Sequence, residues 1–161
     1  MKLLTRILLF LFITFILIEC TPSEKVTEKL EISVIKSEIN VWLNLMPGTS
    51  PGTFNVAGEI NIENTGQADI ENIKLINISV FTGDRDEEIY SIKPYFKPKN
   101  QVIDNSILAG SQKEFTFGTE QGLKILEVVE KNNHVDVQLD FSSDKKIVSY
   151  RINDVEVGRA Y

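Results

Sequence analysis

The side chains of this sequence that could do chemistry are few, and the first of them are the carboxylates of one acidic segment. Asp84, Asp86 and Glu88 follow one another closely after Gly83. Carboxylate oxygens at such spacing are typical ligands of Ca²⁺. Arg85 lies among them, however, and the segment lacks the D-x-D-x-D-G pattern of a calcium loop. The sequence therefore predicts a solvated acidic turn, with a calcium site as the weaker alternative.

Other reactive side chains also lack the rest of a catalytic site. His134 is the only histidine, and no G-x-S-x-G motif accompanies it, so a serine–histidine–aspartate triad is not indicated. Asp136 and Asp140 share one face of an expected strand, where paired carboxylates could cleave glycosides, but solvent-facing acids are the simpler interpretation. Gly118 and Gly122 precede an expected helix without the remainder of a phosphate-binding loop. The sequence thus predicts no enzyme and no cofactor.

The only cysteine, Cys20, follows an N-terminal segment that is typical of an export signal. Lys2 and Arg6 supply a charged start, and Ile7 to Ile18 is apolar apart from one threonine. Because a membrane-spanning helix needs about 20 apolar residues, this shorter run predicts a cleaved signal peptide over residues 1–19 rather than a lasting span.

The segment Leu17-Ile18-Glu19-Cys20 resembles the lipobox of bacterial lipoproteins, in which the cysteine is acylated and becomes the first residue of the mature chain. A small residue is usual before that cysteine, and Glu19 departs from the pattern. The resemblance implies lipid attachment at Cys20, a flexible tether over residues 20–29, and a cell-envelope location at the outer membrane or cell surface. The alternative is a plain secreted protein with a chance cysteine. Acylation would leave the folded part without a thiol.

Composition and length fit one acidic domain over residues 30–161. The chain carries 17 basic and 23 acidic residues, a formal net charge of −6, and the expected signal peptide removes more basic than acidic residues. Such a surface is a poor partner for nucleic acid. The remaining length is enough to bury a hydrophobic core without the support of disulfide bonds or metal ions.

The dominant pattern from about Leu30 onward is alternation of apolar and polar residues, which predicts β-strands. The clearest strand runs from Phe54 to Glu63. In the next, Ile70 to Phe81, the apolar set shifts phase between Leu75 and Ile76, which predicts either a bulge or a strand buried on both faces.

Residues 120–131 are the exception, because their apolar side chains recur at helical spacing and predict one short helix capped by Thr119. Strands return from Val135 to Phe141 and from Val148 to Ile152, and Asn153-Asp154 predicts one more turn. Seven to nine short strands with one helix predict a mainly β, immunoglobulin-like β-sandwich, with a closed barrel as the alternative.

Three segments carry a looser family resemblance: Val56 to Gly66 with its G-x-I-x-I-x-N-x-G strand and turn, Ile73 to Phe81, and Leu108 to Phe117 with its G-x-x-x-x-F-x-F strand. They resemble the FxLYD, CARDB and LEA-type domains of bacterial surface proteins. The resemblance implies an immunoglobulin- or fibronectin-III-like sandwich and transfers no catalytic residue.

Two aromatic groups are candidate contact surfaces. Trp42 and Met46 lie on the opposite strand face from Val41, Leu43 and Leu45 and would form an apolar patch if exposed, whereas burial of a strand covered on both sides is the commoner arrangement. Tyr90, Tyr95 and Phe96 form a second group near prolines, with the same alternative. We therefore expect a non-enzymatic, lipid-anchored protein with a binding or structural role, whose partner is an envelope protein or a glycan. The alternative is a carbohydrate-binding module that uses Trp42 and nearby aromatics. A third hypothesis is capture of an extended peptide by an exposed edge strand.

Overall fold

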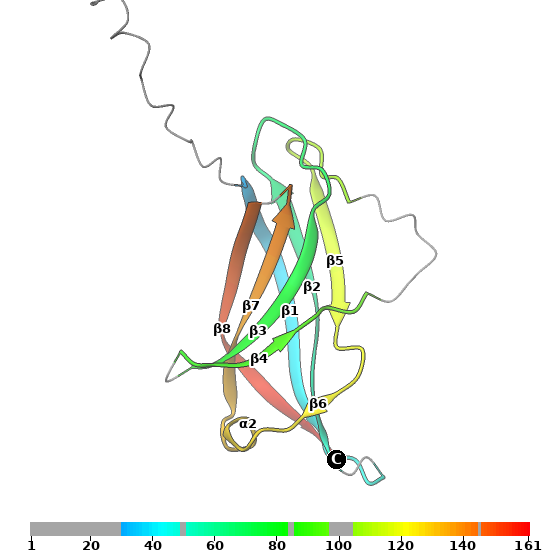
Figure 1. Ribbon diagram of the computed structural model, residues 1–161, viewed down its shortest axis with the longest axis vertical. Helices are drawn as coiled ribbons and strands as arrows, with labels where there is room; N and C mark the ends of the chain where they lie inside the picture. The colour runs from blue at the N-terminus through cyan, green and yellow to red at the C-terminus, as the bar shows by residue number, and fades with distance from the viewer. Residues whose placement is uncertain (1–29, 49–50, 84–85, 97–104, 145) are drawn as a thin grey trace, which may run out of the picture.

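The computed structural model describes residues 30–48, 51–83, 86–96, 105–144 and 146–161 (Figure 1). These ranges are dominated by strands and include one short helix. In chain order the elements are β1 (Ile32–Asn44), β2 (Thr53–Asn64), β3 (Lys74–Thr82), β4 (Glu88–Ile92), β5 (Gln112–Gly118), β6 (Leu123–Lys124), α2 (Glu127–Lys131), β7 (His134–Ser143) and β8 (Lys146–Ala160).

The strands follow one hydrogen-bonded order, β4-β3-β7-β8-β1-β2-β5, and β6 also pairs with β2. Only β1 and β8 are parallel among these pairs. The long β8 pairs with β7 through Lys146 to Glu156 and with β1 through Val157 to Ala160. The sheet therefore folds over along β8 into a first layer of β1, β2, β5 and β6 and a second layer of β3, β4, β7 and the first part of β8 (Figure 1).

The two layers also meet on the opposite flank, where β4 and β5 lie. Tyr95, just after β4, and Gly118, the last residue of β5, exchange backbone hydrogen bonds of 2.8 and 3.0 Å. Before β5, Ile107 and Ile70 exchange two of 2.9 Å. The sandwich is therefore partly closed, which gives it some of the character of a barrel.

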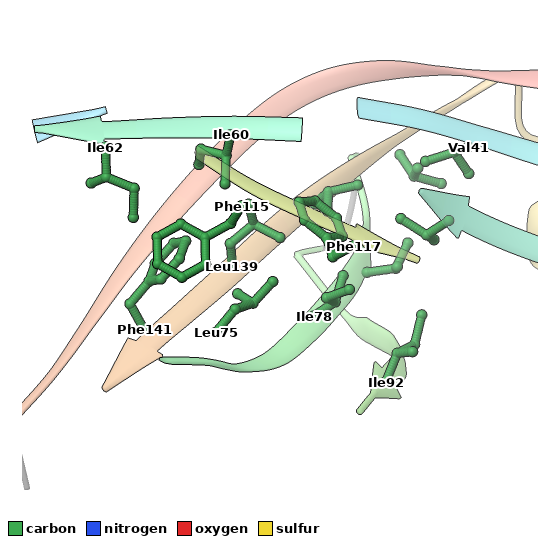
Figure 2. Close-up of a cluster of buried hydrophobic side chains, with 14 of the residues drawn as sticks. Val41, Ile60, Ile62, Leu75, Ile78, Ile92, Phe115, Phe117, Leu139 and Phe141 are labelled. Atoms are coloured by element: carbon green, nitrogen blue, oxygen red, sulfur yellow. The ribbon is translucent and has the colours of Figure 1, made fainter. Parts of the chain in front are cut away.

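The core lies between the layers, because alternate side chains of each strand point inward. Figure 2 shows inward side chains of β2 and β5, such as Ile60 and Phe115, above those of β7 and β3, such as Phe141 and Leu75. The rings of Phe115 and Phe141 meet edge to face, with centroids 5.6 Å apart. The predicted mainly β sandwich is confirmed.

The predicted helix is confirmed but is shorter than its pattern. Leu123 and Lys124 pair with β2 as β6, and α2 begins only at Glu127. Thr119 does not cap it: its backbone N–H donates to the Val56 carbonyl at 2.9 Å, and no side chain caps the helix. The apolar residues of this segment have helical spacing although only part of it is helical, because the two-residue strand β6 and the single turn of α2 both direct apolar side chains into the same core.

The phase shift in β3 is a bulge. The register with β7 passes from Leu75 opposite Phe141 to Asn77 opposite Asp140, which leaves Ile76 without a partner and 40% exposed. The turn predicted at Asn153-Asp154 is wrong, because β8 continues through both residues.

A second register shift, between Val135 and Val137 of β7, accompanies these residues of β8. Asp154 has a φ of 60°, and its N–H donates to Asp136 Oδ1 at 2.9 Å. The polar pair that resembled a turn is therefore accommodated as a bulge.

Candidate functional site

The described residues begin at Leu30, ten residues after Cys20. Cys20 and the expected signal peptide lie outside the described residues, so acylation and export stay predictions. Leu30, the first described residue, is only 8% exposed, and β1 starts two residues later. In the part of the chain that the structure describes, no helix has the length and apolar character needed to cross a membrane.

Trp42 lies on the outer face of the first layer. Its neighbours Val41 and Leu43 are 3% and 0% exposed and point into the core, so alternation directs Trp42 outward. It stands opposite Asn55 of β2 and Gly158 of β8, and its side chain is partly exposed. Because Gly158 has no side chain, β8 adds none at the position beside the indole.

Met46 lies beyond the end of β1 and is 49% exposed. Its backbone N–H donates a hydrogen bond to Asn44 Oδ1 at 3.3 Å, where the chain leaves the strand. The structure therefore places both residues of the first predicted patch at one end of β1, with Met46 the more exposed.

Tyr90 packs within the sandwich. Its ring stacks on Phe54 with centroids 4.4 Å apart, which joins β4 to β2. Its hydroxyl donates to the Lys124 carbonyl at 2.8 Å and accepts the Leu126 N–H at 3.1 Å. Burial raises the pKa of the Tyr90 hydroxyl above its ordinary value, and the hydrogen bond from Leu126 opposes that rise in part. These contacts give Tyr90 a role in packing and separate it from Trp42.

Tyr95 and Trp42 lie on the same face of the first layer. Tyr95 is opposite Gly118, Gly118 is opposite Ala57, and Ala57 is opposite Asn40, two residues before Trp42. Directly opposite residues in a sheet point to the same face. Three strand spacings and two residues along β1 place Tyr95 and Trp42 roughly 16 Å apart.

Between Tyr95 and Asn40 the row contains the small residues Gly118 and Ala57. We call this outer area, with Trp42 and Tyr95 at its ends, the Trp42–Tyr95 surface. Phe96 follows directly after Tyr95 and is 37% exposed. The sequence pattern could not reveal this surface, because its small residues become informative only once the strand order is known.

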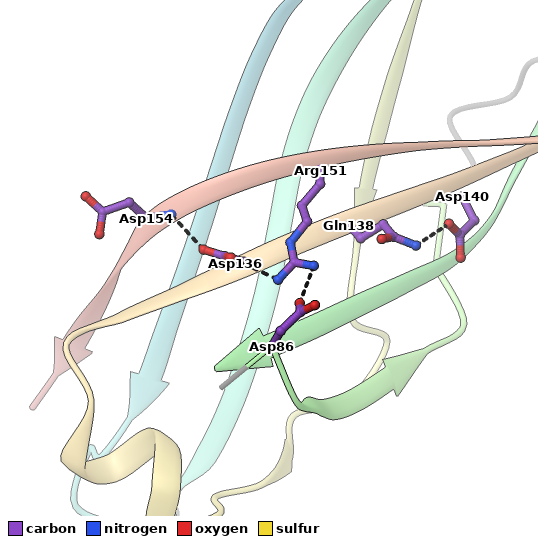
Figure 3. Close-up of polar contacts among 6 residues, drawn as sticks. All are labelled: Asp86, Asp136, Gln138, Asp140, Arg151 and Asp154. Carbon is purple, nitrogen blue, oxygen red and sulfur yellow. Dashed lines mark hydrogen bonds and ion pairs between the residues drawn. The ribbon is translucent and has the colours of Figure 1, made fainter. Parts of the chain in front are cut away.

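The acidic turn is tied to the sheet by an arginine. Asp84 lies outside the described residues, and Glu88 is exposed at the start of β4. Asp86 pairs with Arg151 Nη1 at 2.5 Å, and Arg151 Nη2 donates to Asp136 Oδ2 at 2.9 Å (Figure 3). The described residues contain no group of three potential metal ligands that could hold an ion.

Arg151 also lies over the ring of Phe81, 4.3 Å from its centroid. Partial burial lowers the pKa of the Arg151 guanidinium, but hydrogen bonds and charges from Asp86 and Asp136 outweigh burial and hold that pKa above its ordinary value. Asp86 and Asp136 therefore neutralise a structural cation, and no local sequence pattern indicates that Arg151 is their partner.

The remaining candidate catalytic residues also make polar contacts within the protein. Asp140 Oδ1 accepts hydrogen bonds from Gln138 at 2.9 Å and Ser149 at 2.7 Å, on the outer face of the second layer (Figure 3). His134 Nδ1 lies 3.0 Å from Asp154 Oδ1, and both side chains are more than half exposed. The structure thus places Asp136 and Asp140 in separate polar contacts.

No family model and no curated protein sequence matches this chain. Among solved structures, the sporulation control protein Spo0M from Bacillus subtilis is 16% identical, with a TM-score of 0.37, over 76% of this chain and 49% of that one.

The exo-β-N-acetylglucosaminidase of family GH20 from Vibrio harveyi, in complex with N-acetylglucosamine, is 12% identical with a TM-score of 0.26. That match covers 78% of this chain and 19% of the enzyme. This chain therefore spans about half the length of Spo0M and a fifth of the glucosaminidase.

Proposed function

We propose that this protein is a non-enzymatic, lipid-anchored β-sandwich of the cell envelope that acts by binding through its outer surfaces. The observation that carries the proposal is the position of the only cysteine, at the end of an apolar N-terminal run and ten residues before Leu30, the first described residue. Two or three acyl chains on Cys20 would anchor the domain stably, because each buried methylene contributes about 0.8 kcal/mol.

The contacts of the polar residues support a binding role rather than catalysis. Asp136 neutralises Arg151, and Asp140 accepts hydrogen bonds from Gln138 of its own strand and Ser149 of β8. A general acid or base must instead reach a substrate. The hollow between β4 and α2 is open and shallow, and one of its carboxylates, Glu127, pairs with Lys131.

Fractionation of the producing cell tests the anchor. We expect the wild-type chain in the membrane fraction, resistant to high salt and released by detergent. The Cys20→Ser variant should be absent from that fraction in its processed form. A matched Ser23→Cys, Cys20→Ser double variant keeps one thiol but moves it, and should not restore anchoring. A processed chain that remains in the soluble fraction despite an intact Cys20 contradicts the proposal.

A second candidate function, glycan binding, is favoured by the Trp42–Tyr95 surface. Aromatic rings can stack on the apolar faces of sugar rings, and a floor of small residues lets an extended ligand approach the sheet closely. Asn40 and Asn55 border this floor and offer amide groups to hydroxyls. A spacing of roughly 16 Å between the aromatic residues suits a chain of several sugars rather than one sugar.

Binding to a glycan array with three variants separates this candidate from protein binding. Trp42→Ala and Tyr95→Ala should each weaken binding at least tenfold, and Ala57→Gln should do so by obstructing the floor while both aromatics remain. Tyr161→Ala is the matched control, because that tyrosine is 78% exposed at the chain end, outside the surface. No glycan signal, or equal loss in the control, counts against glycan binding.

A further inference from the structure

One edge of β1 is unpaired over a short stretch of the described sheet. On one side, β1 pairs with β2 along its length. On the other side, β8 pairs only with Val41 to Asn44, so residues 32–40 have no neighbouring strand among the described elements. A bulge between Val34 and Lys36 interrupts the strand near its start. The regular open edge is therefore the stretch between this bulge and the first contact with β8.

The sequence of this open stretch is self-complementary when read in opposite directions. It begins with Lys36-Ser37-Glu38, in which opposite charges lie on either side of a serine. If a second copy pairs antiparallel about a two-fold axis at Ser37, Lys36 of each copy stands opposite Glu38 of the other. The same register sets the two Ser37 residues opposite each other.

The charges around this edge favour such a partner. Glu38 stands directly opposite Glu59 of β2, and both are exposed. Like charges at directly opposite positions destabilise a strand pair, whereas opposite charges stabilise it. Lys36 is exposed opposite Asn61, and the described residues show no ion pair for Lys36 or Glu38. A second copy supplies Glu38 with a cation that no described residue of its own copy provides.

We propose that two copies of this chain associate through the open edge of β1 centred on Ser37, forming a short two-fold antiparallel ribbon with reciprocal Lys36–Glu38 pairs. The ribbon joins the first layers of both copies into one continuous sheet and satisfies backbone groups that an open edge leaves exposed. Its length is limited by β8 on one side and by the bulge on the other.

Charge reversal and its rescue test the register. The full chain, as the cell processes it, is purified in detergent, and its self-association is measured by sedimentation. Lys36→Glu and Glu38→Lys should each weaken association at least about tenfold, because two attractive pairs become repulsive. The double variant Lys36→Glu, Glu38→Lys restores both pairs and should return association to within about threefold of wild type. Glu114→Lys on β5, which changes the net charge by the same amount as Glu38→Lys, is the matched control for that variant.

Zero-length carbodiimide crosslinking locates the contact independently of affinity. An equal mixture of ¹⁴N- and ¹⁵N-labelled wild-type chains should give a crosslinked peptide that joins Lys36 to Glu38 and contains one chain of each isotope. A monomer at high concentration overturns the proposal. So does a dimer whose association is unchanged by the single reversals, or one that the double variant fails to restore.

Discussion

Replacing Asn64 by alanine is expected to lower the free energy of unfolding by about 2–4 kcal/mol. The Asn64 side chain is fully buried at the end of β2. Its Nδ2 donates to the carbonyls of Ala68 at 2.8 Å and Ile107 at 3.1 Å, and its Oδ1 accepts the Gly66 N–H at 3.0 Å. Three hydrogen bonds at about 0.5–1.5 kcal/mol each account for the expected loss.

Urea unfolding, followed by the fluorescence of the single tryptophan, measures this loss. Asn61→Ala is the matched control on the same strand, because Asn61 points outward and makes only a 3.4 Å contact with Gln112. We expect a change within about 0.5 kcal/mol for the control. If Asn64→Ala also changes the free energy of unfolding by no more than about 0.5 kcal/mol, with an unchanged dependence on urea concentration, then the Asn64 side chain does not stabilise the turn that follows β2.

Three further variants test other contacts. Gly58→Ala should lower the free energy of unfolding in urea by about 1–3 kcal/mol, because the added Cβ would lie 2.5 Å from the Glu38 carbonyl oxygen. Gly118→Ala is its control and should change stability little, because the nearest atoms to its added Cβ are 3.5 Å away. Because the pKa of the Tyr90 hydroxyl is raised in the folded state, this group contributes fully to folding stability below about pH 10, and the contribution is lost as pH rises through the folded-state pKa. Tyr90→Phe should therefore reduce the fall in melting temperature at alkaline pH, and an unaltered fall would contradict this. Arg151→Gln should cost about 1–2 kcal/mol in thermal unfolding, since a partly buried carboxylate loses its cation, and an unchanged midpoint would rule this out.

Local sequence patterns were sufficient to predict strands that pack one face against the core and expose the other face to solvent. The alternation from Val135 to Phe141 predicts β7 because inward residues must be apolar for the layers to pack. The phase shift at Ile76 likewise marks a bulge, because an extra residue inverts every later side chain. Both features are local, so one segment of sequence contains the information.

Features that depend on distant partners could not be predicted in the same way. The strand at Leu123-Lys124 exists because Thr53 and Phe54 offer it an edge, and nothing in its own spacing distinguishes it from a helical turn. Tyr90 resembles an exposed aromatic residue until Phe54 is placed beneath its ring. Asn153-Asp154 has turn composition, but pairing with β7 continues on both sides and converts it to a bulge.

The same reasoning separates the two candidate aromatic groups. Alternation alone directs Trp42 outward from β1, and the structure bears this out. The relation between Trp42 and Tyr95 needs the complete order β1-β2-β5 and the bridge to Gly118, which connects segments far apart in the sequence. A binding surface built across strands is therefore visible only after the fold is known.

The mass of the N-terminal peptide of the membrane-extracted protein tests the proposed anchor most directly. The proposal predicts a chain that begins at Cys20 and carries a thioether-linked diacylglyceryl group with a further acyl chain on its amino group. The Cys20→Ser chain should retain residues 1–19. A free thiol at Cys20, or a mature chain that begins at another residue, would contradict the lipid anchor.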